Sequence, residues 1–188
     1  MPADPARLPS NRELAEVFQT IADYLSLDGE SPYRILAYEK AAALFGDHPL
    51  SIAAMASRGE LRELPGVGQA IETKVLEYMA TGQIAFLESL RPRYPEGLLT
   101  VMHVPGMGPK KTRLVWEAAG VADIRDLERA CREGRVRDIP GMGEKTETKL
   151  LAAIEAWKVR AANGAGVRRL HSLVEPQAAR FVEALRAL

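Results

Sequence analysis

"VPGMGPKK", residues 104–111, sets a proline and two glycines within four consecutive positions and, after a second proline, adds two lysines. The same pattern occurs twice more, in "LPGVGQAIETK" beginning at Leu64 and in "IPGMGEKTETK" beginning at Ile139. Each copy has an apolar residue, Pro, Gly, an apolar residue and Gly, followed by a segment with apolar residues on one helical face. A turn that recurs at the same place before a helix predicts one structural unit used three times.

Composition limits the class of protein. Of the 188 residues, 47% are hydrophobic and 27% are charged, as in ordinary globular proteins. Lysine plus arginine equals aspartate plus glutamate at 25 each, so any binding to nucleic acid has to come from local groups. The single cysteine, Cys131, excludes an internal disulfide. Without a spanning apolar run or a signal-peptide pattern, we expect a soluble cytoplasmic protein that does not contact membranes.

Helical periodicity runs through nearly the whole chain, and no stretch alternates clearly enough to predict a strand. Ser10 followed by Glu13 forms a capping box, and Ser31 with Pro32 begins a second helix that runs to about Gly46. Further helices are expected over residues 52–57, 69–80, 108–120, 123–134, 143–164 and 176–188. The sequence therefore predicts an all-α fold of two small helical units, residues 10–92 and 93–163, with a linker and C-terminal helix over 164–188.

The chemistry of the repeated turn suits a phosphate group. Glycine permits positive φ and close approach of another backbone, and proline fixes the angle of entry. The helix that follows begins with free N–H groups and the positive end of its dipole. A single copy is explained by an economical turn, but three copies favour phosphate binding. The predicted DNA-backbone contacts are Gly66, Val67 and Gly68, Gly106, Met107 and Gly108, and Gly141, Met142 and Gly143, with the middle apolar residue of each packing inward.

The second copy carries the most uncompensated positive charge. Three basic residues follow its turn with no acid among them: Lys110, Lys111 and Arg113. In the third copy, Lys145, which is also a predicted DNA contact, and Lys149 are offset by Glu144 and Glu147. In the first copy, Lys74 is offset by Glu72. We therefore expect the second turn to hold DNA most tightly.

The three segments resemble helix-hairpin-helix motifs, which grip nucleic-acid backbone without reading bases. Their order is similar to the amino-terminal half of bacterial family X DNA polymerases, a lyase-type domain with one hairpin followed by helical fingers with more. The resemblance runs from about Asn11 to about Leu188. It is carried by "ELAEVFQTIADYLSLDGESPYRILAYEKAA", "LRELPGVGQAIETKVLEYMATG", "PEGLLTVMHVPGMGPKKTRLVWEAAGV" and "IPGMGEKTETKLLAAIEAW".

This resemblance implies roles for individual residues of the first unit. Lys74 falls on the position of the lysine that forms a Schiff base with a 5′-deoxyribose phosphate. Arg34 and Tyr38 match positions that hold the 5′-phosphate and line the pocket, and Lys40 is a nearby strand contact. Two other basic positions of the pocket are Ala70 and Phe86 here, so the pocket is poorer in charge.

Hairpins of this family also bind a monovalent cation, K⁺ or Na⁺, through carbonyl oxygens of the turn. By resemblance, the ligands are the carbonyls of Arg62, Leu64 and Val67 in the first turn and of Met102, Val104 and Met107 in the second. No other cofactor is expected. The Gly-Ser turn and the metal-binding aspartates of the family's palm have no match in the sequence, so we expect no polymerase activity.

Three hypotheses about function remain open at this point. The first is sequence-independent binding of gapped, nicked or 5′-phosphate-ended DNA in repair, with a repair polymerase or nuclease as a further candidate partner. The second is a 5′-deoxyribose-phosphate lyase that uses Lys74, although a solvated surface lysine explains the same residue equally well. The third is a protein-docking module, which the balanced net charge allows.

Overall fold

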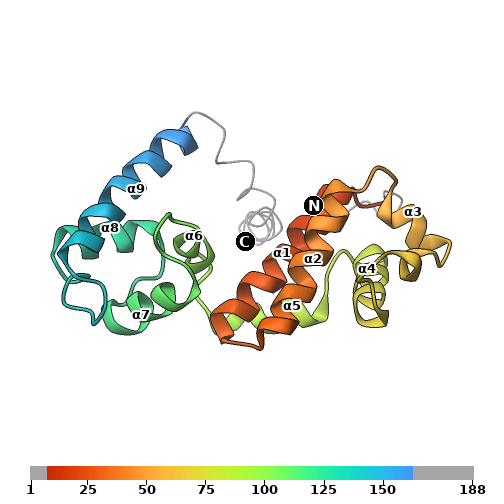
Figure 1. Cartoon of the computed structure of the whole chain (residues 1–188), viewed down its shortest axis with the longest axis horizontal. Helices are drawn as coiled ribbons and strands as arrows, with labels where there is room; N and C mark the ends of the chain where they lie inside the picture. The colour runs from red at the N-terminus through yellow and green to blue at the C-terminus, as the bar shows by residue number, and fades with distance from the viewer. Residues whose placement is uncertain (1–7, 163–188) are drawn as a thin grey trace, which may run out of the picture. The chain divides into compact units, whose positions relative to one another are not determined.

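The structure is a computed structural model of the 188-residue chain, and it describes residues 8–162 (Figure 1). The chain divides into two compact units, one ending at Arg93 and the other beginning at Tyr94. Residues 8–93 are termed the N-terminal unit and residues 94–162 the C-terminal unit. All regular structure within residues 8–162 is helical, which confirms the expected all-α fold. The linker and helix expected over 164–188 lie outside the described residues.

The N-terminal unit is built on two long helices, α1 and α2, which pack against each other (Figure 1). Large apolar side chains on these two helices are fully buried, among them Leu14, Phe18, Ile21 and Phe45. The elements in order are α1 (Asn11–Asp28), α2 (Pro32–Asp47), α3 (Ile52–Ser57), the 3-10 turn η1 (Leu61–Glu63), α4 (Gln69–Thr81), α5 (Ala85–Leu90) and the 3-10 turn η2 (Arg91–Arg93).

The start of α1 is fixed by the capping box that the sequence predicts. The Ser10 hydroxyl accepts the N–H of Glu13 at 3.2 Å, and the Glu13 carboxylate accepts the N–H of Ser10 at 2.6 Å. The next residue, Asn11, donates to the carbonyls of His48 and Leu50 at 2.9 and 2.8 Å. Its side-chain oxygen accepts the N–H of Ile52 at 2.8 Å, so one amide ties the α2–α3 loop to α1.

The C-terminal unit contains α6 (Leu98–Met102), α7 (Pro109–Ala119), α8 (Ile124–Arg132) and α9 (Glu144–Ala162). Each helix contributes a fully buried apolar residue to the core, as Leu98, Val115, Leu127 and Ile154 illustrate. Within residues 8–162, no helix combines the length and the apolar character that crossing a membrane requires.

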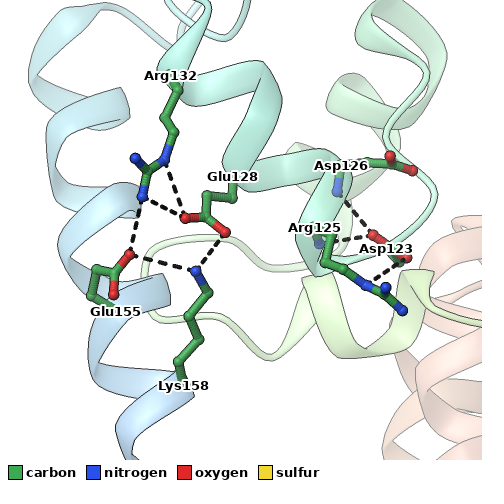
Figure 2. A network of polar contacts seen from close by, with 7 residues as sticks. All are labelled: Asp123, Arg125, Asp126, Glu128, Arg132, Glu155 and Lys158. Atoms are coloured by element: carbon green, nitrogen blue, oxygen red, sulfur yellow. Dashed lines mark hydrogen bonds and ion pairs between the residues drawn. The ribbon is translucent and has the colours of Figure 1, made fainter.

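Figure 2 shows a polar network that joins α8 to α9. The Glu128 carboxylate lies 2.6 Å from Lys158 Nζ and 2.7 Å from the Arg132 guanidinium, and Glu155 contacts the same two cations at 3.5 and 3.3 Å. Hydrogen bonds from Lys158 and Arg132 lower the pKa of Glu128. Because both cations are substantially exposed, solvent screens these pairs and each contributes little to stability. The network therefore fixes how α8 lies on α9 more than it adds stability.

The sequence located most of the helices, including the short α3, and missed two short ones. Asp123 caps α8 as expected, its carboxylate accepting the N–H groups of Arg125 and Asp126 at 2.7 and 2.9 Å (Figure 2). Helices α5 and α6, of six and five residues, were not expected. They are too short to display a helical period, and burial stabilises them, since Leu87 and Leu90 of α5 are 3% and 1% exposed.

A buried carboxylate holds the third Pro-Gly turn against α9. Glu147 is 2% exposed and accepts three hydrogen bonds from Arg137, one from its N–H at 3.0 Å and two from its guanidinium at 2.8 and 2.5 Å. Burial by itself raises the pKa of Glu147, but the hydrogen bonds from Arg137 outweigh burial and lower it. The charged carboxylate thus connects the chain before the turn to the helix after it.

We expect Glu147→Gln to destabilise the C-terminal unit by about 1–3 kcal/mol at neutral pH, because an amide replaces a charged acceptor of three hydrogen bonds. A carboxyl whose pKa is lowered on folding contributes stability above its unfolded pKa and loses it as the pH falls through the folded value. The deficit of the variant should therefore shrink at pH values below 4.5, the ordinary value of the group.

The measurement is urea unfolding followed by tryptophan fluorescence, since both tryptophans, Trp116 and Trp157, lie in the C-terminal unit. A variant as stable as the wild type at neutral pH, or a deficit that persists unchanged in acid, contradicts this role for Glu147.

Candidate nucleic-acid interface

The three Pro-Gly turns share one backbone geometry. In each, the N–H of the apolar residue between the glycines donates to the carbonyl three positions earlier: Val67 to Leu64 at 3.1 Å, Met107 to Val104 at 2.9 Å and Met142 to Ile139 at 2.9 Å. That apolar residue is 6%, 9% and 0% exposed, so it packs inward as expected. The first glycines, Gly66, Gly106 and Gly141, have φ of 82°, 92° and 83°. The sequence repeat is therefore a structural repeat.

The second turn differs from the first at its second glycine. Gly108 has φ 96° and ψ 169°, a region that only glycine adopts readily, and its N–H donates to the carbonyl of Met102 at 3.2 Å. The corresponding Gly68 has φ −91° and ψ 175°, ordinary extended backbone. The second turn is therefore closed by one more hydrogen bond and depends on glycine at one more position.

Helices α4 and α7 begin directly after the first and second turns. Their N-caps are Gly68 and Gly108, and glycine has no side chain with which to accept the first-turn N–H groups. These N–H groups and the positive end of the helix dipole are consequently available to an anion. The first turn of α7 contains no acidic residue, whereas that of α4 contains Glu72. The start of α7 is the more electropositive of the two.

The basic residues after the second turn occupy three different settings. Lys110 is exposed at the surface, and Arg113 is half-buried on α7. The Lys111 ammonium folds back over the turn and donates to the carbonyl of Gly106 at 2.8 Å. Two positive charges, Lys110 and Lys111, thus lie at the start of α7, one directed to solvent and one attached to the turn.

At the third turn, the acidic residues do not neutralise the lysines of α9, contrary to the sequence prediction. Glu147 does not offset the lysines of α9, because it is buried and paired with Arg137. Glu144 also faces Arg137, at 3.9 Å. Lys145 is exposed. The acids at this turn therefore neutralise an arginine that precedes it, a pairing that sequence spacing did not indicate.

In the N-terminal unit, three predicted site residues surround Phe86, a residue for which the sequence predicts no role of its own. Arg34 and Tyr38 lie on α2, Lys74 on α4 and Phe86 on α5. The guanidinium carbon of Arg34 is 5.1 Å and Lys74 Nζ is 5.3 Å from the centroid of the Phe86 ring. The Tyr38 ring stacks on Phe86 with centroids 6.3 Å apart and an interplanar angle of 23°. These four residues are termed the Phe86 cluster.

Two features of the Phe86 cluster bear on its charge. Tyr38 is 6% exposed, and burial raises its pKa although the Arg34 charge opposes the rise, so its phenol is neutral at physiological pH. Arg34 also pairs with Glu30 at 3.2 Å. Lys40 is exposed and lies two positions beyond Tyr38 on α2, which places it on another face of the helix. The structure therefore brings Arg34, Tyr38 and Lys74 together and leaves Lys40 outside.

The carbonyl groups predicted to hold a cation lie on the first two turns. Those of Leu64 and Val104 each accept the hydrogen bond that closes the turn, and that of Met102 accepts the N–H of Gly108. A carbonyl oxygen has two lone pairs, so each of these groups retains one. The remaining predicted donors, from Arg62, Val67 and Met107, are carbonyl oxygens of the same turns. Neutral carbonyl oxygens are the type of ligand that hard cations take in proteins.

Comparisons with known proteins match both units. A family model described as a helix-hairpin-helix domain matches residues 9–84, and one described as a SAM-like helix-hairpin-helix tandem matches residues 98–156. The chain is 34% identical over 148 residues, 78% of its length, to the DNA polymerase/3′-5′ exonuclease PolX of Bacillus subtilis (strain 168). The aligned region covers 25% of that relative. One domain plus one tandem agree with three turns, and the resemblance that the motifs indicated is confirmed.

The geometry of the second turn predicts unequal effects of alanine at two glycines of the C-terminal unit. A Cβ added at Gly108 or at Gly143 meets open space, but Gly108 has φ 96° and Gly143 does not have a positive φ. We expect Gly108→Ala to cost about 1–3 kcal/mol through backbone strain. Gly143→Ala, the matched control, should change stability by less than about 0.5 kcal/mol.

Urea unfolding followed by tryptophan fluorescence measures both variants in the same unit. Equal stability of Gly108→Ala and Gly143→Ala would show that the second turn does not depend on the positive φ of Gly108.

Proposed function

We propose that this chain, whose two units carry helix-hairpin-helix motifs and resemble the amino-terminal half of bacterial family X DNA polymerases, binds DNA independently of sequence. The observation that carries the proposal is the start of α7, where free first-turn N–H groups coincide with Lys110 and Lys111 and with no first-turn acid. Phosphodiester groups need such donors and such charge, and they offer no sequence information to read.

A preference for gapped, nicked or 5′-ended DNA is part of the proposal. Two sites of different character support it. The second turn suits a continuous backbone, because it presents N–H groups and lysines along the start of a helix. The Phe86 cluster combines the cations of Arg34 and Lys74 in another unit and suits a strand end. DNA interrupted by a gap supplies both kinds of phosphate in one molecule. A repair polymerase or nuclease is the corresponding candidate partner.

We also propose that K⁺ or Na⁺ binds the carbonyl groups of the first turn. Bound there, the cation supplies positive charge near a DNA phosphate. Its predicted ligands are Arg62, Leu64 and Val67. At the second turn, the Lys111 ammonium already donates a hydrogen bond to the carbonyl of Gly106. In the sequence, Gly106 lies between the predicted ligands Val104 and Met107. The first turn is therefore the better candidate for a cation.

Reversing the charge of the second turn should remove most DNA binding. We expect Lys110→Glu combined with Lys111→Glu to weaken affinity for a gapped duplex roughly ten-fold or more at low salt, because two attractive phosphate contacts become repulsive. The matched control reverses two exposed lysines of α9, Lys145→Glu with Lys149→Glu, and should weaken binding less than about three-fold. Fluorescence anisotropy with a labelled duplex provides the measurement.

Equal losses in the two double variants would contradict the assignment to the second turn, and no DNA binding by the wild type would favour the protein-docking hypothesis. The same titration in tetramethylammonium chloride, at the ionic strength of the potassium chloride buffer, tests the cation. Affinity that is unchanged in tetramethylammonium would exclude a cation requirement.

A 5′-deoxyribose-phosphate lyase is the second candidate, and the convergence of Lys74, Arg34 and Tyr38 in the Phe86 cluster favours it. In this reaction the Lys74 amine adds to C1′ of the open-chain sugar and water leaves, which forms a Schiff base. Loss of a C2′ proton and cleavage of the C3′–O bond then release the DNA strand with its 5′-phosphate. Hydrolysis of the Schiff base frees the unsaturated sugar and restores Lys74.

Borohydride trapping separates the lyase from a purely binding function. The wild type should form a covalent adduct with a gapped duplex that carries a 5′-deoxyribose phosphate, and Lys74→Ala should not. The control is Lys149→Ala, which removes an exposed lysine of α9 outside the Phe86 cluster and should leave the adduct unchanged. Retained DNA binding without an adduct in the wild type excludes the lyase.

A further inference from the structure

We propose that Phe86 is a positioning residue for a terminal phosphate. Its ring holds Arg34 and Lys74 as one two-pronged cationic site, which makes the chain prefer DNA with a 5′-phosphate over the same DNA with a 5′-hydroxyl. This inference rests on the DNA-binding function proposed above and adds the residue that sets selectivity for the strand end.

The Phe86 ring is the outer member of a row of aromatic side chains that begins in the core. Phe45 and Phe18 are fully buried and contact each other edge to face, with ring centroids 5.1 Å apart. Phe18 contacts Tyr38 at 6.0 Å, and Tyr38 stacks on the half-buried Phe86 at 6.3 Å. Aromatic pairs in these geometries have favourable contacts beyond apolar burial. The ring therefore rests on a packed base.

The backbone that carries Phe86 is fixed as well. Helix α5 begins at Ala85, whose N–H donates to the Glu77 carboxylate of α4 at 2.7 Å. On either side of Phe86, Ile84 and Leu87 are 1% and 3% exposed. A short helix tied at its first residue and anchored by buried neighbours holds the ring in one place, so the ring can organise side chains that would otherwise sample many conformers.

The two cations come from different helices and converge on this ring. Arg34 of α2 and Lys74 of α4 both lie within 5.3 Å of the Phe86 centroid, so both positive charges lie beside one aromatic ring. The negative face of an aromatic ring attracts both cations and offsets part of their mutual repulsion. A pair of cations held in this way binds a multiply charged anion more strongly than a singly charged one.

A terminal phosphate therefore suits this site better than an internal one. A phosphate monoester carries about −1.5 to −2 charges at neutral pH, whereas a phosphodiester in the strand carries one. Glu30 competes with a phosphate for Arg34, because the two side chains form an ion pair at 3.2 Å. Both side chains are exposed, that of Arg34 to 45% and that of Glu30 to 37%. An exposed pair of this kind is weak, so a phosphate displaces Glu30 at little cost.

The experiment compares two gapped duplexes that differ in one group, a 5′-phosphate or a 5′-hydroxyl at the downstream strand. The full chain is tested as wild type, as Phe86→Leu, which keeps apolar bulk and removes the aromatic face, and as Phe86→Tyr, which keeps that face. We expect Phe86→Leu to reduce the preference for the 5′-phosphate roughly five- to ten-fold, since two cation–π contacts are lost. Phe86→Tyr should retain it, and affinity for the 5′-hydroxyl duplex should be the same in all three proteins.

The outcomes are distinguishable. An unchanged preference in Phe86→Leu, or an equal loss in Phe86→Tyr, overturns the role of the ring. A wild type that binds both duplexes equally, with binding that still depends on Lys110 and Lys111, overturns the inference and leaves the DNA-binding function standing. A wild type that binds neither duplex contradicts the proposed function itself.

A second test, by NMR, uses the wild-type protein alone and does not depend on the folding of a variant. In the free wild-type protein, the ring current of Phe86 should shift the Hδ protons of Arg34 and the Hε protons of Lys74 upfield in the NMR spectrum, because both side-chain ends lie over the ring. Resonances at their ordinary positions would overturn the inference.

Discussion

The hydrogen bond that closes each Pro-Gly turn is the constraint on which both units depend. In all three turns it occurs with the first glycine at positive φ, and the intervening Val67, Met107 or Met142 is buried in the core. Burial of that side chain fixes the direction in which the next helix leaves the turn. Packing in the core thus sets where the free N–H groups of that helix lie. If the turns bind phosphate as proposed, the binding surface is a consequence of a backbone that the core already holds.

The same backbone carries different side chains in each copy, and these decide what each turn does. After the second turn, the charges of Lys110 and Lys111 remain at the start of α7. After the third, the glutamate at position 147 points into the core and holds Arg137 before the turn. One copy thus leaves positive charge at its helix start, and the other uses a residue of its helix to hold the turn. A shared fold does not imply equal affinity for DNA.

Local signals in the sequence were sufficient for every helix of residues 8–162 except α5 and α6. Ser10 with Glu13, Asp123 and the recurring glycines act within a few residues, so their geometry follows from spacing alone. The site could be predicted only in part. The pairing of Arg137 with Glu147 and the placement of Phe86 beside Lys74 depend on contacts between separate elements. Helix α5, which carries Phe86, owes its existence to burial rather than to any propensity visible in six residues.

An aromatic residue at position 86 changes the site in kind. Where the resemblance implies a basic residue, a third cation would add attraction for phosphate but also repulsion toward Arg34 and Lys74. The ring adds no charge of its own but attracts both cations. Compared with a third cation, it gives the site less attraction for phosphate and a more defined arrangement of its two charges. Long-range attraction depends on the number of charges, whereas discrimination between a phosphate and a hydroxyl depends on their placement. On the proposal that this site binds a terminal phosphate, an aromatic residue at position 86 favours selectivity for a strand end over general affinity for DNA.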